Sequence, residues 1–244
     1  MNSIILCEGS TDFVLLQYLM RKAYGWSDAE NQSMILRGKV KRSRTLEKGD
    51  GRLTIAGCGG VSRLLPVLDY VLERNRLSAG NEANDKIVLI TDRDEIETEA
   101  FFENKINGIL EEHDFHGEEG ICHGKWDGYT YRNGQGKEKQ VELLLLVIPF
   151  EEKGAMETFL LGAISQNDCY DADIIEKTNL FVEGIDSEKR YLTKRRYLTK
   201  AKFDVYFSVR TAAEQFVERQ NIIKNIEWEK YILIQESFQK LEEI

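Results

Sequence analysis

Short apolar runs alternate with amphipathic segments along the first two thirds of this chain, and no other sequence feature limits the fold as strongly. Apolar runs of strand length lie at residues 3–7, 52–56, 86–91 and 141–149. Segments whose apolar residues have helical spacing lie at 10–24, 61–75, 95–112 and 155–164. Strands that are apolar on both faces and separated by helices predict a parallel sheet with helices on both faces, an α/β fold.

The predicted alternation is interrupted by two polar stretches, residues 27–52 and 113–141, which we expect to be insertions. Asn133–Gly134 in the second stretch is a typical hairpin turn. Beyond residue 166 the pattern becomes helical, with candidate helices at 170–183, 188–200, 210–221 and 225–242. We therefore predict an α/β core over residues 1–166 and a helical C-terminal part over residues 167–244.

Composition excludes several classes of protein. The four cysteines lie far apart and form no CxxC pair, which argues against a disulfide framework and a cysteine zinc site. No apolar run reaches the roughly 18 residues of a membrane helix, and the N-terminus lacks the pattern of a signal peptide. We therefore expect a soluble, cytoplasmic protein with no membrane partner.

The net charge of -9 argues at first against a nucleic-acid partner. Basic charge is nevertheless concentrated in residues 37–52, with a net charge of +5, and in residues 189–202, with +7. Tyr191 and Tyr197 lie within the second segment, and aromatic rings among cations suit nucleic acid. A merely solvated helix face is the alternative. The candidate nucleic-acid-binding residues are Arg42, Arg44, Lys194, Arg195, Arg196 and Lys200.

Carboxylates follow the predicted strands at the points where the strands end. Parallel strands share one carboxyl edge, where ligands of α/β proteins bind. Two carboxylates about 4 Å apart repel by about 4 kcal/mol at an effective dielectric of 20. A cluster of them should therefore take up protons or a cation, and oxygen ligands suit Mg²⁺ or Mn²⁺. The candidate metal ligands and catalytic residues are Glu8, Asp12, Asp92, Asp94 and Glu157. Helix capping is the alternative role for each residue taken alone.

Two of these acidic motifs resemble a known domain. The motif Glu8-Gly9-Ser10-Thr11-Asp12 behind one apolar run, with Asp92-Arg93-Asp94 behind another, resembles the Toprim domain over roughly residues 1–165. Topoisomerases, bacterial primases, small recombination and RNA-maturation proteins and OLD-family nucleases share that domain. With Gly154 three residues before Glu157, the pattern is most similar to the OLD-like branch and its stand-alone relatives.

The resemblance implies a Toprim-like core that cleaves phosphodiester bonds in DNA or RNA with one or two Mg²⁺ or Mn²⁺ ions. It implies that Glu8 is a metal ligand or general acid/base and that Asp92 and Asp94 bind Mg²⁺. It also implies that Asp12 and Glu157 help to hold a second ion.

The sequence departs from the larger Toprim enzymes in informative ways. No GxxxxGK[ST] motif is present, so an ATPase would be a separate subunit. There is little room for the tyrosine domain of a topoisomerase, and no cysteine spacing supports the zinc ribbon of a primase. The alternatives are a non-catalytic Toprim module that binds nucleic acid or a partner protein, and a primase-like nucleotidyl transferase. Self-association into a homo-oligomer is left open.

Overall fold

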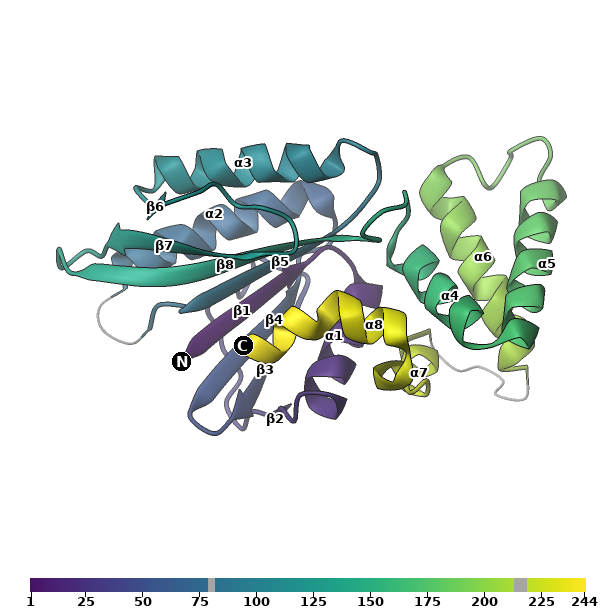
Figure 1. Ribbon diagram of the computed structural model, residues 1–244, viewed down its shortest axis with the longest axis horizontal. Coiled ribbons are helices and arrows are strands. Elements are labelled where there is room, and N and C mark those ends of the chain that lie inside the picture. Colours follow the sequence, from purple (N-terminus) through teal and green to yellow (C-terminus); the bar gives the residue numbers. More distant parts are fainter. Residues whose placement is uncertain (79–81, 213–218) are drawn as a thin grey trace.

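A mixed eight-stranded sheet lies at the centre of the computed structural model, which describes residues 1–78, 82–212 and 219–244 (Figure 1). The strand order is β2-β3-β4-β1-β5-β8-β7-β6. The four central strands run parallel, in the order β4 Gly51–Gly57, β1 Asn2–Cys7, β5 Lys86–Asp92 and β8 Glu138–Ile148. Their carboxyl ends therefore share one edge, as the sequence predicts.

Helices cover both faces of this sheet (Figure 1). On one face lie α2 Val61–Leu77 and α3 Thr98–Glu112, and on the other α1 Ser10–Lys22 and α4 Met156–Asn167. Successive strand residues point to opposite faces. Ile4 and Leu6 of β1 therefore pack in the apolar cluster under α2 and α3, while Ile5 packs in the cluster under α1 and α4. Burial on both faces explains why the parallel strands are continuous apolar runs.

The predicted parallel core is extended at both edges by antiparallel strands, which the sequence analysis treats only as insertions. Residues 27–52 contain β2 Ser27–Asp28 and β3 Arg42–Lys48, and β3 pairs antiparallel with β4 through a tight turn at Gly49, whose φ is 55°. Residues 113–141 contain β6 His116–Gly117 and β7 Trp126–Arg132, which extend the other edge: β7 pairs antiparallel with β8, and β6 pairs antiparallel with β7. Hairpins need only a short turn, whereas parallel pairs need a crossover, so both insertions become sheet.

Two helices stand beyond the carboxyl edge of the parallel strands, α5 Cys169–Ile185 and α6 Arg195–Arg210 (Figure 1). The helix predicted at 188–200 is wrong in its first half. The carboxylate of Asp186 accepts backbone N–H groups of Arg190, Tyr191 and Leu192, which stabilises a loop before α6. The helix predicted at 210–221 falls largely outside the described residues, and the next described element is α7 Arg219–Lys224.

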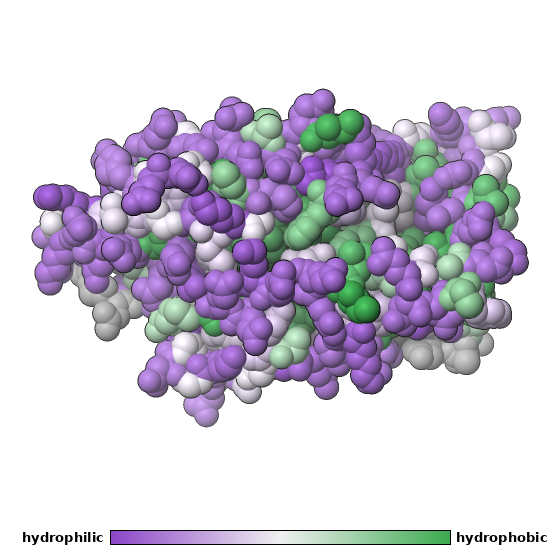
Figure 2. Space-filling view, viewed as in Figure 1, coloured by the Kyte–Doolittle hydropathy of each residue, from purple (hydrophilic) through white to green (hydrophobic). Residues whose placement is uncertain are grey.

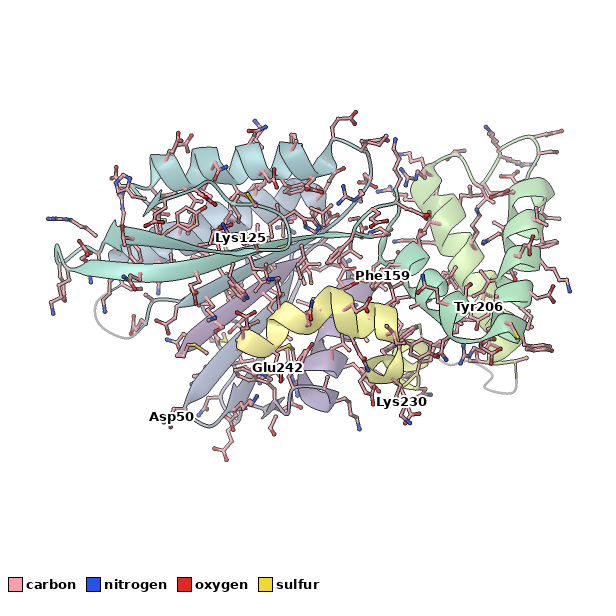
Figure 3. All side chains as sticks on the ribbon, in the orientation of Figure 1. Asp50, Lys125, Phe159, Tyr206, Lys230 and Glu242 are labelled. Carbon is pink, nitrogen blue, oxygen red and sulfur yellow. The ribbon has the colours of Figure 1, made fainter. Side chains whose placement is uncertain are left out.

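The end of the chain returns to the sheet. The single helix predicted at 225–242 is instead three short pieces, η1 Trp228–Lys230, α8 Ile232–Phe238 and η2 Gln239–Glu243. Trp228 and Phe238 are fully buried, and the ring of Phe238 meets that of Phe159 edge-on with centroids 5.9 Å apart. Figure 3 labels Phe159. The last residues of the predicted C-terminal part therefore share the apolar core of the sheet.

The visible surface is mostly hydrophilic, with apolar residues scattered over it (Figure 2). Within the described residues, no helix is both long and apolar enough to cross a membrane.

Candidate functional site

The turn from β1 into α1 places two of the predicted acids. The backbone carbonyl of Glu8 accepts the N–H groups of Gly59 and Gly60, at 2.9 and 3.0 Å, which ties the end of β1 to the loop behind β4. The N–H of Gly9 then donates to Oδ2 of Asp12 at 2.7 Å, so that Asp12 caps the first turn of α1. Helix capping is thus one role of Asp12, and it holds one oxygen of this carboxylate in place.

At the end of β5, Asp92 connects the other parts of the site. Its N–H and the hydroxyl of Thr91 both donate to Oε1 of Glu8, the former at 3.1 Å. Oδ1 of Asp92 accepts the N–H of Met156, the first residue of α4, at 2.9 Å. Adjacent parallel strands and the helix behind β8 are therefore joined through two carboxylates.

Glu157 lies in the first turn of α4 and faces α1. The hydroxyl of Thr11 donates to its Oε1 at 3.0 Å. Gly154 allows the close packing before this helix, because a Cβ atom there would lie 2.9 Å from Cβ of Thr158. Gly154 thus has a packing role in the turn before α4.

All five predicted acids line one cavity of about 480 Å³ at the carboxyl edge of the sheet. Glu8, Asp12 and Glu157 are buried, with 8%, 4% and 4% of their surface exposed. Asp92 is half-buried and Asp94 is exposed at the cavity. The sequence prediction that these strand-end acids converge agrees with this arrangement.

Cations from both basic segments line the same cavity. They are Lys41, Arg42, Arg195, Arg196 and Lys200. Four of these were candidates from the sequence, and Lys41 was not, although it directly precedes Arg42. Thr11 and Thr91 were also missed as partners of the carboxylates. Their signal is their position, since Thr11 lies within the EGSTD motif and Thr91 directly precedes Asp92.

Two predicted nucleic-acid contacts are not among the residues that line the cavity. Arg44 forms an ion pair with Asp28, with Nε 2.7 Å from Oδ1. Arg44 pairs with Ile55, whereas Arg42 pairs with Gly57 at the end of β4. Arg44 is therefore two residues further along the strand from the carboxyl edge where the cavity lies. Lys194 occupies the N-cap position of α6, without a capping hydrogen bond from its side chain, and is exposed.

Burial and like charge make these carboxyls hold protons more strongly than usual. Burial, with the neighbouring Asp12 and Asp94, raises the pKa of Glu8 to about 7, against hydrogen bonds that lower it. Burial and Glu157 raise the pKa of Asp12 to about 6, although Lys200 opposes the shift. The pKa of Asp92 is raised well above its usual value, by burial first and then by Asp12, Glu8 and Glu157.

The donor chemistry of this cluster fits a divalent cation of the Mg²⁺ type. Across the part of the chain that the structure describes, no three His, Cys, Asp or Glu side chains already form a metal-binding group. The acids present are nevertheless all oxygen donors, and hydrogen bonds hold four of them. Burial first and mutual repulsion second raise the pKa values of Glu8, Asp12 and Asp92, and a bound cation would oppose both effects.

Fold and site together define an α/β protein with an acidic, cation-walled cavity at the carboxyl edge of its sheet. The chain belongs to the family described as "Protein of unknown function (DUF3226)", which matches residues 2–238. No curated protein matches the sequence.

Among solved structures, the chain is similar to a hypothetical protein from Pyrococcus horikoshii OT3. The two share 20% identity over 99% of this chain and 91% of the other, with a TM-score of 0.56, which supports a common fold. A glyoxalase/dioxygenase from Nostoc punctiforme shares 13% identity over 58% of this chain and 88% of its own, with a TM-score of 0.19. A lactoylglutathione lyase from Agrobacterium tumefaciens shares 11% over 59% and 92%, with a TM-score of 0.17. Neither of these two similarities is close enough to bear on fold or function.

Proposed function

We propose that this protein is a Toprim-like enzyme that cleaves phosphodiester bonds of nucleic acid with Mg²⁺ or Mn²⁺. The observation that carries the proposal is that acids from three separate parts of the chain and cations from both basic segments line one cavity. Buried carboxylates that repel one another are stabilised by a cation, and clustered cationic side chains are stabilised by an anion. A phosphodiester bound next to a divalent metal satisfies both requirements.

The acids divide into two sets by their place in the fold. Glu8, Asp92 and Asp94 follow adjacent parallel strands and would hold the first ion, while Asp12 and Glu157 begin α1 and α4 and would help to hold a second. Bound metal supplies activation of a water molecule and stabilisation of the leaving oxygen.

Glu8 is the best general acid/base of the cluster if it is not fully committed to the metal. Its pKa of about 7 in the metal-free protein is suited to giving and taking a proton near neutral pH. The hydroxyl of Thr91 and the N–H of Asp92 hold one oxygen of Glu8, so the carboxyl keeps a fixed orientation.

Substrate binding is the role of the cationic walls. Lys41 and Arg42 approach from the β3 side of the cavity, and Arg195, Arg196 and Lys200 from α6. Such side chains neutralise phosphate charge and fix the position of the backbone without reading its sequence.

The test is a cleavage assay with Mg²⁺ or Mn²⁺ on single- and double-stranded DNA and RNA, using wild type and Asp92→Asn. Asparagine keeps an oxygen that can accept the N–H of Met156, so the variant should fold while cleavage falls below detection. Glu111→Gln, an exposed change at the end of α3, is the matched control and should cleave like wild type. Full activity of purified Asp92→Asn would contradict the assignment.

A non-catalytic module that binds nucleic acid is the second candidate. The observation that favours it is that cations from both basic segments line the cavity, because such side chains bind a phosphate backbone whether or not it is cleaved. Calorimetric titration with Mg²⁺ and binding of labelled nucleic acid separate the two. Binding without turnover on every substrate would support the module over the enzyme.

A further inference from the structure

We infer that the nucleic acid that enters this cavity is unpaired, a single strand of DNA or RNA whose bases stack on Tyr197 and Tyr191. This inference rests on the proposed function, because it names the substrate class of the same cavity. It is carried by the depth of the acids, by two exposed tyrosine rings in the same basic segment as the cations of α6, and by cations from two separate segments that line the cavity.

The depth of the carboxylates limits what can reach them. Glu8, Asp12 and Glu157 are at most 8% exposed, so a phosphate that meets them must enter the cavity. The cavity of about 480 Å³ has the size of a small-ligand pocket. A double helix with paired and stacked bases does not fit that volume, whereas an unpaired strand can bend its backbone into it. The size of the cavity therefore favours an unpaired strand where the substrate contacts these acids.

The wall that α6 forms carries cations, and Tyr197 follows Arg196 in the sequence without being one of the residues that line the cavity. Arg196 and Lys200, four residues apart on α6, both line the cavity. The guanidinium carbon of Arg196 lies 5.0 Å from the ring centroid of Tyr197, and its Nη2 donates to the tyrosine hydroxyl at 3.2 Å. Tyr197 is 38% exposed, so part of its ring surface is open to a ligand beside this wall.

A second exposed ring lies in the loop that leads into α6. Tyr191 is 71% exposed, and the guanidinium carbon of Arg190 lies 5.5 Å from its ring centroid. Both tyrosines thus pair a π-face with a neighbouring guanidinium. Unpaired bases stack on such faces, whereas the bases of a duplex are already stacked on each other.

The start of α6 is held at the mouth of the cavity. The guanidinium of Arg195 donates to the backbone carbonyl of Asp94, in the segment between β5 and α3. Figure 1 shows this end of α6 facing that segment. Lys41 and Arg42 line the cavity from the β3 side. Cations on two sides of a concave site suit the flexible backbone of a single strand that passes between them.

The experiment measures binding separately from cleavage. Fluorescence anisotropy uses the Asp92→Asn protein with Mg²⁺ and three probes of about 20 nucleotides: oligo(dT), oligo(U) and a blunt DNA duplex. We expect at least one single strand to bind about tenfold more tightly than the duplex. Tyr197→Ala and Tyr191→Ala, added to the same protein, should each weaken single-strand binding by about fivefold or more and leave duplex binding unchanged.

The matched control is Tyr170→Ala, since Tyr170 is a 72% exposed tyrosine at the start of α5, outside the basic segment. It should bind the single strand normally, and Tyr197→Phe should retain most of the affinity that Tyr197→Ala loses. Equal affinity for duplex and single strand, or tyrosine variants that bind normally, would overturn the inference.

The two proposals fail in different ways. Tyrosine-dependent single-strand binding by a wild-type protein that cleaves nothing would refute the enzyme and support the unpaired strand as ligand. Metal-dependent cleavage of duplex that is insensitive to both tyrosines would support the enzyme and refute the unpaired strand.

Discussion

Glu8→Gln should make the metal-free protein more stable at alkaline pH. Burial raises the pKa of Glu8 from 4.5 to about 7, so the folded protein keeps a proton that the unfolded chain releases. The stability that neutral Glu8 contributes is fully present below pH 4.5 and is lost as the pH rises towards 7. Glutamine removes this loss because it stays neutral at every pH.

The size of the effect follows from the shift. The rise of the Glu8 pKa from 4.5 to about 7 corresponds to about 3 kcal/mol of folding free energy, at roughly 1.4 kcal/mol for each pKa unit. Glutamine keeps an Oε1 that can accept from the Thr91 hydroxyl and the Asp92 N–H. The variant should therefore gain up to about 3 kcal/mol near pH 8 and much less near pH 5.

Urea unfolding with a chelator present, near pH 5 and near pH 8, measures this difference. The fluorescence of the fully buried Trp228 reports unfolding of the core. Glu95→Gln is the control. A hydrogen bond from Lys153 lowers the pKa of the exposed Glu95 carboxyl, so replacing this carboxyl should not stabilise the protein at high pH. The reasoning is refuted if Glu8→Gln changes stability equally at both pH values, or destabilises near pH 8.

Three further predictions concern metal binding, a buried hydrogen bond and the end of the chain. Mg²⁺ should raise the midpoint of thermal unfolding of wild type more near pH 8 than near pH 5, because it must displace protons from the acids, and a pH-independent shift would contradict this. Thr11→Val should cost about 1–3 kcal/mol in urea unfolding, since it removes a donor to the buried carboxylate of Glu157, and an unchanged midpoint would argue against that contact. Phe238→Ala should cost about 3–5 kcal/mol in the unfolding of the whole protein, because Phe238 packs on Phe159 in the core of the sheet. A separate, weaker transition would instead indicate an independent C-terminal unit.

Much of the α/β core could be predicted because its signals are local. The apolar runs at 3–7 and 86–91 match β1 Asn2–Cys7 and β5 Lys86–Asp92 within a residue at each end. Glu8 and Asp92 stand where these runs end, and parallel strands bring their ends to one edge. The convergence of the acids follows from these two facts together.

The edges of the sheet could not be predicted in the same way. β3 Arg42–Lys48 has four charged side chains and two buried residues, so it carries little apolar pattern of its own. Its strand conformation depends on pairing with β4 across the turn at Gly49. The start of α6 was also not predicted. The Asp186 carboxylate binds backbone N–H groups of the preceding residues and so stabilises a loop there in place of a helix.

By itself, the sequence determined the α/β alternation, the acids at the strand ends and the two concentrations of basic charge, because each depends on residues that are neighbours along the chain. Only the tertiary structure decided that Lys41 and Arg42 line the same cavity as Arg195 and Arg196, while Arg44 and Lys194 do not. Which basic side chains meet the acids depends on the register of β3 against β4 and on where α6 begins. The register depends on cross-strand pairing, and the start of α6 depends on the loop that the Asp186 carboxylate holds and on the bond from Arg195 to the carbonyl of Asp94; none of these contacts is visible in the pattern of neighbouring residues.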